Sequence, residues 1–304
     1  MKLNVKAGDI TKQDVDAIVV NLFEGISNPG GATGAVDKSI NGAISSLIKD
    51  GEITGKLGEL TLIHSQRTIK PKRILVVGLG PKEKFDSDKI RFVCGKAIRF
   101  LGEKKIKSCA TILHGAGNGS IQPEIAARSI AEGTVLGSYR FGIHKSEKSS
   151  LHVEELLVVE SEKSKIDAIK SGIDQGVIMA NSAALARDLV NQPANYMTPS
   201  DLVDVATDIC DGNSLQLEVF DEKRMQELKM GALLGVAKGS VVPPRMIIIK
   251  YTGDPEHPEN NLGLIGKGIT FDSGGISIKP SSGMAAMKGD MAGAASVICT
   301  MKAI

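Results

Sequence analysis

The sequence contains no tryptophan, and aromatic residues make up only 3% of its 304 residues. Its formal net charge is +2, so neither sign of charge is in marked excess. Proteins that bind nucleic acid or anionic membranes commonly present a basic surface, and binding of single strands also uses aromatic stacking. These absences argue against nucleic acid and membrane surfaces as partners.

Long apolar runs are also absent. No segment approaches the roughly 20 apolar residues of a membrane-spanning helix, and the first residues, MKLNVKAGDI, lack the basic and apolar regions of a secretory signal. The cysteines form no C-x-x-C pair and have no histidine nearby at zinc-site spacing. We therefore expect a cytoplasmic protein in which all the cysteines are reduced and buried, namely Cys94, Cys109, Cys210 and Cys299.

The first half of the chain alternates strand-like and helix-like segments. Short apolar runs bounded by turn residues predict buried strands at Asp16–Asn21, Arg73–Gly80, Cys109–His114 and His152–Val159. Helical patterns fall at Ala35–Lys49, Ser87–Leu101 and Gln122–Ser138. Strands that alternate with helices predict an α/β domain with a mostly parallel sheet.

Charged, turn-rich residues at Glu160–Lys165 follow the last of these strands, and we place the end of an N-terminal domain, 1–165, there. A long helical pattern from Ile166 then ends at Asn191-Gln192-Pro193, which predicts a linker helix over 166–192. The second domain covers 193–304. Its predicted strands are Leu215–Phe220, Met246–Tyr251 and Leu262–Gly266, and its predicted helices are Ser200–Cys210, Asp221–Lys229 and a last one from about Asp290.

Two carboxylates and two lysines gather in one glycine-rich window of the second domain. Lys267, Asp272 and Lys279 lie within Gly266–Pro280, and Asp290 follows ten residues after Pro280. Carboxylates are hard donors suited to divalent cations. A lysine ligates only as the neutral amine, against its usual pKa of about 10.4, but adjacent dications can impose that deprotonation. The cluster predicts a metal site; the alternative is a glycine-rich loop with surface salt bridges and an aspartate that caps a helix.

The place of the window in the predicted fold favours ligand binding. Lys267 directly follows the predicted strand Leu262–Gly266, and open α/β sheets bind ligands outside the carboxyl ends of their strands. Gly268, Gly274 and Gly275 allow sharp turns and a close approach of the backbone to a ligand.

Nucleotide-binding patterns fit poorly. A P-loop needs G-x-x-x-x-G-K-[ST], but the first glycine is replaced by Asn261 and the last position is Gly268. Gly78-Leu79-Gly80 begins like a dinucleotide-binding turn, but Glu83 stands where the third glycine belongs. His257, in a Pro-Glu-His-Pro turn, is expected to be an exposed loop residue and no ligand.

The window reads GKGITFDSGGISIKP over Gly266–Pro280 and MKGDMAGAA over Met287–Ala295. These segments closely resemble the leucine aminopeptidase (cytosol aminopeptidase) family. The resemblance is strong over about 170–304 and weak over the first half. It extends upstream through Ala186–Asn191, Pro193–Asn195, Gly231–Leu234, Lys238–Ser240 and Pro243–Arg245.

The resemblance implies a macro-like N-terminal α/β domain followed by the first part of an α/β metallo-aminopeptidase domain. It implies two divalent metal ions, zinc or manganese, with magnesium and cobalt as further candidates. Asp272 would bridge the ions, while Lys267 and Asp290 would bind the more loosely held one. Lys279 would be the catalytic lysine that stabilises the oxyanion. The implied substrates are peptides, from which N-terminal residues such as leucine are released.

Complete members of that family carry a later Asn-Thr-Asp-Ala-Glu-Gly-Arg motif, with two more metal carboxylates and an arginine that holds a bicarbonate. They assemble as hexamers. The motif does not occur in this sequence. We therefore expect a catalytic domain that is incomplete at Ile304, and a chain that alone binds metal weakly and hydrolyses no peptide. A homo-hexamer is expected of the full-length enzyme.

The first half of the chain is similar to macro domains that bind ADP-ribose. The similar segments are Gly8–Thr11, Val15–Asn21 and the glycine-rich Gly30–Ala35, which precedes a helix whose amides could cradle phosphate. Where such sites have paired asparagines, this chain reads Asn21-Leu22-Phe23-Glu24, and Glu24 opposes an anion. We expect shared architecture without ADP-ribose binding; a non-catalytic nucleotide-binding or interaction module is the alternative function.

Overall fold

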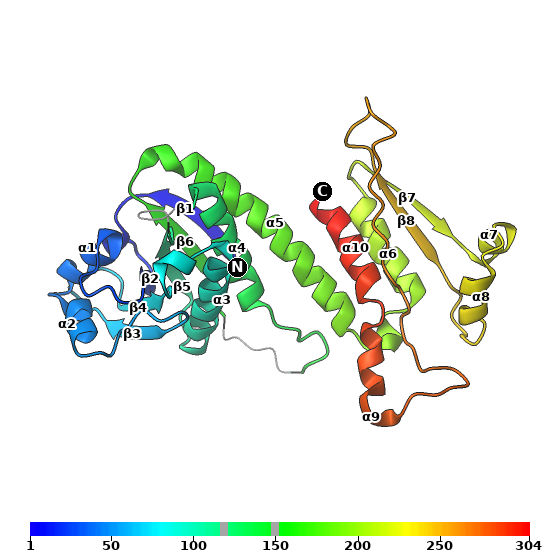
Figure 1. Cartoon of the computed structure of the whole chain (residues 1–304), viewed down its shortest axis with the longest axis horizontal. Coiled ribbons are helices and arrows are strands. Elements are labelled where there is room, and N and C mark those ends of the chain that lie inside the picture. Colours follow the sequence, from blue (N-terminus) through cyan, green and yellow to red (C-terminus); the bar gives the residue numbers. More distant parts are fainter. Residues whose placement is uncertain (116–120, 147–151) are drawn as a thin grey trace. The chain divides into compact units, whose positions relative to one another are not determined.

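The structure is a computed structural model that describes residues 1–115, 121–146 and 152–304. The chain divides into two compact units, Met1–Asn181 and Ser182–Ile304. Each unit has a hydrophobic core of its own. Figure 1 labels the elements of both units.

The first unit is built on a six-stranded sheet in the order β1-β6-β5-β2-β4-β3. Only β3 is antiparallel to its neighbour in this sheet, and the other pairings are parallel. The strands are β1 (Lys2–Ala7), β2 (Ala17–Leu22), β3 (Leu60–His64), β4 (Arg73–Gly78), β5 (Ser108–Ile112) and β6 (Glu155–Glu160). The predicted α/β class with a mostly parallel sheet is confirmed.

Helices follow the strands of this sheet. They are α1 (Gly31–Ser39), α2 (Ala43–Lys49), α3 (Ser87–Glu103), α4 (Pro123–Ser138) and the first part of α5 (Ile166–Asn191). Short 3₁₀ helices lie at Ile10–Lys12, Lys82–Lys84 and Lys163–Lys165. Asp86 caps α3, because its carboxylate accepts the backbone N–H of Lys89 at 3.0 Å. Pro123 occupies the first turn of α4, where its missing N–H costs nothing.

The two faces of the sheet are covered by different helices. Ile18 and Val20 of β2 belong to one apolar cluster, together with Val36 of α1. Val19, which lies between them, belongs to a second cluster that includes Ile98 of α3. Successive side chains of a strand point to opposite faces. A continuous apolar run such as AIVVNL therefore indicates burial on both sides, and the central strands were predicted from that pattern.

The single helix predicted over Ala35–Lys49 is wrong. The chain turns between α1 and α2 at Asn41 and Gly42, whose φ angles are 59° and 77°. A helix cannot continue through two left-handed residues. Asp37 supports the new helix start, because its carboxylate accepts the backbone N–H of Ile44 at 2.8 Å.

The strands β1 and β3 lie outside the predicted ones. Both form edges of the sheet, and their residues are exposed or half-exposed. In β1 the apolar residues alternate with lysine and asparagine, and in β3 the run is short. These patterns are weaker signals than the apolar runs of the central strands.

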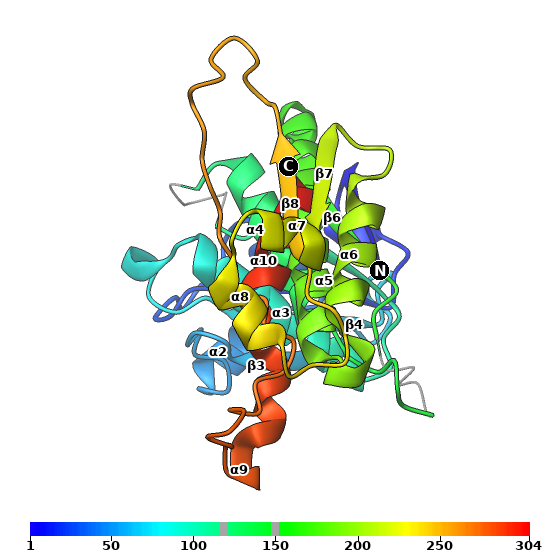
Figure 2. The ribbon, with the colours of Figure 1, turned by 90° about the vertical axis from the view of Figure 1, so that its right-hand side faces the viewer.

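The second unit combines helices with a two-stranded antiparallel sheet, which Figure 2 shows with its strands side by side. Its elements after α5 are α6 (Pro199–Cys210), β7 (Leu215–Phe220), α7 (Glu222–Glu227), α8 (Gly231–Ala237), β8 (Met246–Tyr251), α9 (Ser281–Met284) and α10 (Ala292–Ala303). Two 3₁₀ helices lie at Ala194–Tyr196 and Ala285–Gly289. Among the described helices of either unit, none is long and apolar enough to cross a membrane.

The core of the second unit brings together residues of several helices. Leu189 of α5, Leu202 of α6 and Ile298 of α10 are buried in one cluster, against which apolar residues of β7 and β8 pack. The helix predicted from Ile166 is α5, which runs from the first unit into the second. Its role as a linker between domains ending at 165 and beginning at 193 stays a prediction.

The strand predicted at Leu262–Gly266 is wrong. The segment pairs with no strand among the described residues, and it has no regular secondary structure. Leu262 is 87% exposed and Ile265 is 98% exposed. A strand exists only through its bonds to a neighbouring strand. The apolar composition of the segment favours a β-strand, but the described part of the chain offers no strand with which it could pair.

Three of the four cysteines are buried as predicted, whereas Cys210 is half-buried. All four are free. Burial raises the pKa of Cys109 to about 12 and that of Cys299 to about 11, so both thiols stay protonated at neutral pH.

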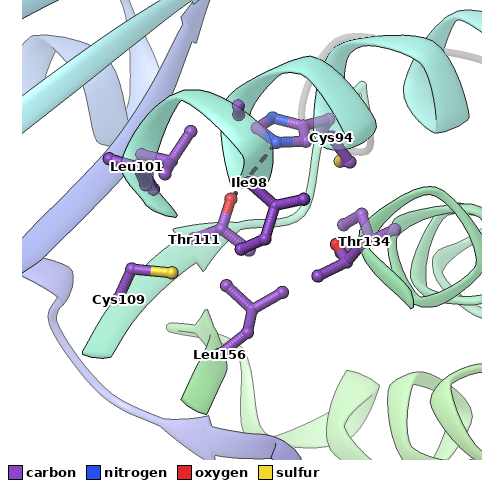
Figure 3. Close-up of a pocket in the computed structure, with 11 residues that line it drawn as sticks. Cys94, Ile98, Leu101, Cys109, Thr111, Thr134 and Leu156 are labelled. Carbon is purple, nitrogen blue, oxygen red and sulfur yellow. Dashed lines mark hydrogen bonds between the residues drawn. The ribbon is translucent and has the colours of Figure 1, made fainter. Parts of the chain in front are cut away.

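A small pocket lies between the sheet and the helices α3 and α4 of the first unit. Figure 3 shows its lining, with Cys109 and Thr111 from β5, Leu156 from β6 and Thr134 from α4. Thr111 carries the dashed hydrogen bond, to His114. The lining is mostly apolar, so this pocket belongs to the core of the unit.

His114 is buried at this pocket with both ring nitrogens occupied. The side-chain amide of Asn21 donates to Nδ1 at 2.9 Å, so the proton lies on Nε2, which contacts the hydroxyl oxygen of Thr111 at 3.2 Å. His114 is only 1% exposed, and burial lowers its pKa from 6.5 to about 4. The folded protein therefore holds this imidazole neutral.

We expect His114 to make the first unit sensitive to acid. The unfolded chain binds a proton near pH 6.5, whereas the folded chain binds it only near pH 4. Acidification through that window therefore favours unfolding, by up to about 3 kcal/mol. The measurement is urea unfolding of the chain and of His114→Gln at pH 7 and pH 5. The wild type should lose more stability than the variant, and equal losses would contradict the prediction.

Candidate metal centre

The window from Gly266 to Asp290 is held against the first turn of α10 by its backbone. The backbone N–H of Ala294 donates to the carbonyl oxygen of Lys267 at 2.9 Å. Gly266 lies directly against Gly293, where a Cβ atom on Gly266 would overlap the carbonyl group of Gly293. Two glycines thus allow a contact between backbones that side chains would prevent.

Lys267 and Asp290 form the first ion pair of the site. The Lys267 Nζ atom lies 2.8 Å from Oδ1 of Asp290, and the Asp290 side chain is only 19% exposed. The second carboxylate oxygen, Oδ2, is buried and has no hydrogen-bond partner among the described residues. A buried carboxylate oxygen normally has a partner. Asp290 therefore presents a desolvated anionic oxygen that a cation could satisfy.

Lys279 and Asp272 form the second ion pair, across a tight turn. The Lys279 Nζ atom lies 2.6 Å from Oδ2 of Asp272, and the backbone N–H of Gly274 donates to Oδ1 at 2.9 Å. The turn closes with a bond from the backbone N–H of Lys279 to the carbonyl oxygen of Ser273 at 2.8 Å. Gly274 has φ 91°, and a Cβ atom there would overlap the Ser277 carbonyl oxygen.

The charges of the two pairs act on one another. The hydrogen bond from Lys279 lowers the pKa of Asp272 below its usual value of 3.8, and the backbone N–H of Gly274 and the charge of Lys267 lower it further. The structure thus joins the four residues that the sequence singled out in two ion pairs, and the charge of Lys267 acts on Asp272 of the other pair. Their roles as metal ligands and as catalytic lysine stay a prediction.

The donor set fits part of a divalent-metal site. Asp272 and Asp290 supply hard oxygen donors, and the unpartnered Oδ2 of Asp290 is already desolvated. No group of three or more His, Cys, Asp or Glu side chains within the described ranges could hold a metal ion. Lys267 would have to lose its proton to become a ligand. The chemistry of these residues therefore fits part of the ligand set that a metal pair needs.

The alternative to a metal site, a glycine-rich loop with surface salt bridges and an aspartate that caps a helix, is only partly met. Both lysines do form ion pairs, as that alternative requires. However, the residue before α10 is Met291, and no side chain caps this helix. Asp290 instead turns its carboxylate to Lys267. Capping does not explain why an aspartate stands at this position.

Lys288 is a residue of this region that sequence reasoning did not single out. Its Nζ atom donates to the carbonyl oxygen of Asn191, at the end of α5, at 2.8 Å. The only sequence signal is a basic residue two positions before Asp290 in the MKGD segment. His257 meets its prediction, since it is exposed and its Nδ1 lies 3.0 Å from Asp254.

Of the segments similar to macro domains, Val15–Asn21 forms most of β2 as expected, whereas the glycine-rich segment does not precede a helix but lies within α1 from Gly31 onward. Asn21 lies at the end of β2, and Gly30 precedes α1, whose Thr33 hydroxyl donates to the Asn21 carbonyl oxygen at 2.8 Å. The Asn21 side-chain amide is bonded to His114. Glu24 is exposed in the loop between β2 and α1. Whether this unit binds a ligand stays untested.

Models of one protein family match both units. The model described as the catalytic domain of the cytosol aminopeptidase family matches residues 184–304, which include the whole window. The model of the N-terminal domain of the same family matches residues 19–148. The chain belongs to the cytosol aminopeptidase family.

Curated relatives and solved structures agree with this assignment. A probable cytosol aminopeptidase of Alkaliphilus metalliredigens is 37% identical over 307 residues, which cover 100% of this chain and 61% of the relative. One of Solibacter usitatus is 38% identical and is covered to 59% of its length. The chain thus spans about three fifths of the length of these relatives.

Two solved structures resemble this chain in fold. The bottromycin maturation enzyme BotP in complex with Mn has a TM-score of 0.76 and 29% identity, over 95% of this chain and 56% of that one. A tomato leucine aminopeptidase mutant has a TM-score of 0.80 over 100% of this chain and 59% of that one. The tomato protein is 24% identical, so it shows the fold alone.

We expect Gly266→Ala to disrupt this family site through the backbone. The added methyl group would overlap the Gly293 carbonyl and separate Lys267 from α10, at a cost of about 1–3 kcal/mol. The measurement is hydrogen exchange of the Ala294 amide, which reports the bond to Lys267. Gly263→Ala is the control, because a Cβ atom there meets nothing within 4 Å. Equal protection of Ala294 in both variants would refute the proposed role of the glycine contact.

Proposed function

We propose that this chain supplies part of the active site of a metal-dependent aminopeptidase, which releases N-terminal residues such as leucine from peptides. The observation that carries the proposal is the pairing of Lys267 with Asp290 and of Lys279 with Asp272 on one glycine-rich window. The match of this window to the family's catalytic-domain model supports it, as does the solved relative that is described in complex with Mn.

Asp272, Asp290 and Lys267 would hold two divalent metal ions, zinc or manganese, with magnesium or cobalt as further candidates. Such a pair of ions supplies a polarised carbonyl and a water of lowered pKa. Asp290 is prepared for this role, because its buried Oδ2 has no other partner among the described residues. The side chain of Lys267 is 57% exposed, so it has room to move away from Asp290 toward solvent.

Lys279 would serve as the catalytic lysine. Its ammonium group donates to Asp272 at 2.6 Å, and the turn between them is closed by the bond from the Lys279 backbone N–H to the Ser273 carbonyl oxygen. A positive charge fixed in this way needs little rearrangement to meet a substrate oxygen that becomes negative during peptide hydrolysis. The pairing with Asp272 holds the ammonium group in place until the substrate arrives.

The limited donor set leads to a proposal about the chain by itself. Two carboxylates and a lysine leave a pair of divalent ions short of ligands. We propose that the chain alone binds metal weakly and hydrolyses no peptide. Bicarbonate, a homo-hexamer and a cytoplasmic location belong to the same proposal for the full-length enzyme. They rest on the family membership of the chain.

We expect the window to bind Mn²⁺ through its two aspartates. Asp272→Asn and Asp290→Asn should each weaken Mn²⁺ binding at least roughly tenfold, because each removes a charged oxygen donor. Asp254→Asn is the control, since Asp254 is exposed and pairs with His257 outside the window. The measurement is the free-ion signal of Mn²⁺ in electron paramagnetic resonance. Unchanged binding in both window variants would refute the metal site.

A peptidase assay tests the proposal that the chain alone hydrolyses no peptide. We expect the chain to leave leucyl-p-nitroanilide intact in the presence of Mn²⁺ or Zn²⁺. The full-length relative from Alkaliphilus metalliredigens, assayed beside it, is the reference for an active enzyme. Turnover by the chain comparable to that of the reference would show that the residues present suffice for catalysis.

The alternative function, binding of ADP-ribose or another nucleotide by the first unit, draws less support. The Asn21 amide already bonds His114, and the exposed Glu24 adds negative charge to the same loop. Micromolar binding of ADP-ribose in calorimetry would restore this alternative.

A further inference from the structure

Lys288 connects the window from Gly266 to Asp290 to the end of α5. Its Nζ atom donates to the carbonyl oxygen of Asn191 at 2.8 Å, across 97 residues of sequence. Asn191 is the last residue of α5. The last carbonyl groups of a helix lack partners within the helix and carry its partial negative charge. An ammonium group is a well-matched donor for that position.

The residue after Lys288 makes a second contact with the same helix end. Gly289 packs on Val190, whose Cγ1 atom would lie 3.6 Å from a Cβ atom at Gly289. The next residue is Asp290, and its backbone N–H donates to the carbonyl oxygen of Met287 at 3.2 Å. The short peptide that carries Asp290 is therefore fixed against α5 by one hydrogen bond and one packing contact.

The other side of Asp290 is fixed by the glycine contact. The bond from the Ala294 backbone N–H to the Lys267 carbonyl oxygen holds the backbone at Lys267 against α10. The Nζ atom of Lys267 then lies 2.8 Å from Asp290. Asp290 thus lies between two anchored segments, with its Oδ2 atom buried and without a partner in the described part of the chain. Movement on the Lys288 side would shift that oxygen.

We propose that Lys288 is a positioning residue for Asp290, and that it sets the orientation in which Asp290 receives a divalent cation. Lys288 acts through the backbone and does not touch the cation, because its ammonium group is bonded to Asn191. This role rests on the proposed metal site, since it specifies how one of its ligands is held. Carboxylates that bind metal commonly depend on such supporting contacts.

The test compares Mn²⁺ binding by the chain and by three variants. Lys288→Met removes the donor and keeps most of the side chain, and it should weaken Mn²⁺ binding roughly tenfold. Lys288→Arg keeps a donor for the Asn191 carbonyl and should restore most of the affinity. Lys302→Met is the control for lost charge, because Lys302 is an exposed lysine on α10.

A second control separates positioning from general loss of stability. Leu202→Ala removes apolar contacts from the core of the second unit and leaves the Lys288 donor to the Asn191 carbonyl oxygen unchanged. If Lys288 only stabilises the fold, Leu202→Ala should weaken Mn²⁺ binding as much as Lys288→Met does at a matched loss in urea midpoint. Under the proposal, only Lys288→Met weakens binding.

A readout without metal keeps the positioning claim testable by itself. The carboxyl ¹³C signal and the amide exchange rate of Asp290 should change in Lys288→Met and stay near the wild type in Lys288→Arg and Lys302→Met. No change at Asp290 in Lys288→Met would overturn the positioning role. If the wild-type chain bound no Mn²⁺ while Asp290 still responded to Lys288, the proposed metal site would fail and the positioning of Asp290 would stand.

Discussion

The site depends on one contact, the backbone approach of Gly266 to Gly293 at the start of α10. Because a Cβ atom on Gly266 would overlap the Gly293 carbonyl group, this approach requires glycine. It allows the Ala294 amide to bond the Lys267 carbonyl oxygen at 2.9 Å. Among the described residues, the segment Leu262–Gly266 just before Lys267 pairs with no strand. The ion pair between Lys267 and Asp290 follows from that backbone contact.

The charges of the window are balanced, so that a bound cation could replace a lysine as the partner of an aspartate. Each aspartate is matched by one lysine, so the site carries no excess charge in the absence of a ligand. The pKa of Asp272 is lowered, chiefly by the hydrogen bond from Lys279, which keeps this carboxylate ionised. The buried imidazole of His114 in the first unit differs from these charged groups. His114 is held neutral among bonded partners, which is the arrangement of a core residue.

Much of the fold could be predicted where local pattern and tertiary environment agree. The central strands carry apolar runs that suit burial on both faces, and both their class and their positions are confirmed. Prediction failed where the secondary structure of a segment depends on its tertiary neighbours or on the conformation of a turn. Leu262–Gly266 has the composition of a strand but no partner among the described residues, and a left-handed turn at Asn41 and Gly42 divides the predicted helix. The contact of Lys288 with the Asn191 carbonyl oxygen could not be predicted, because the two residues lie 97 positions apart in the sequence.

The sequence by itself determined the α/β class, the cluster of two lysines and two aspartates, and the family, because periodicity and a long motif are local properties. Tertiary structure alone decided the pairings within the cluster. Lys279 meets Asp272 across a turn that Gly274 permits, whereas Lys267 meets Asp290 through the docking of α10. Such pairings depend on the path of the backbone between the residues, and contacts distant in sequence determine that path.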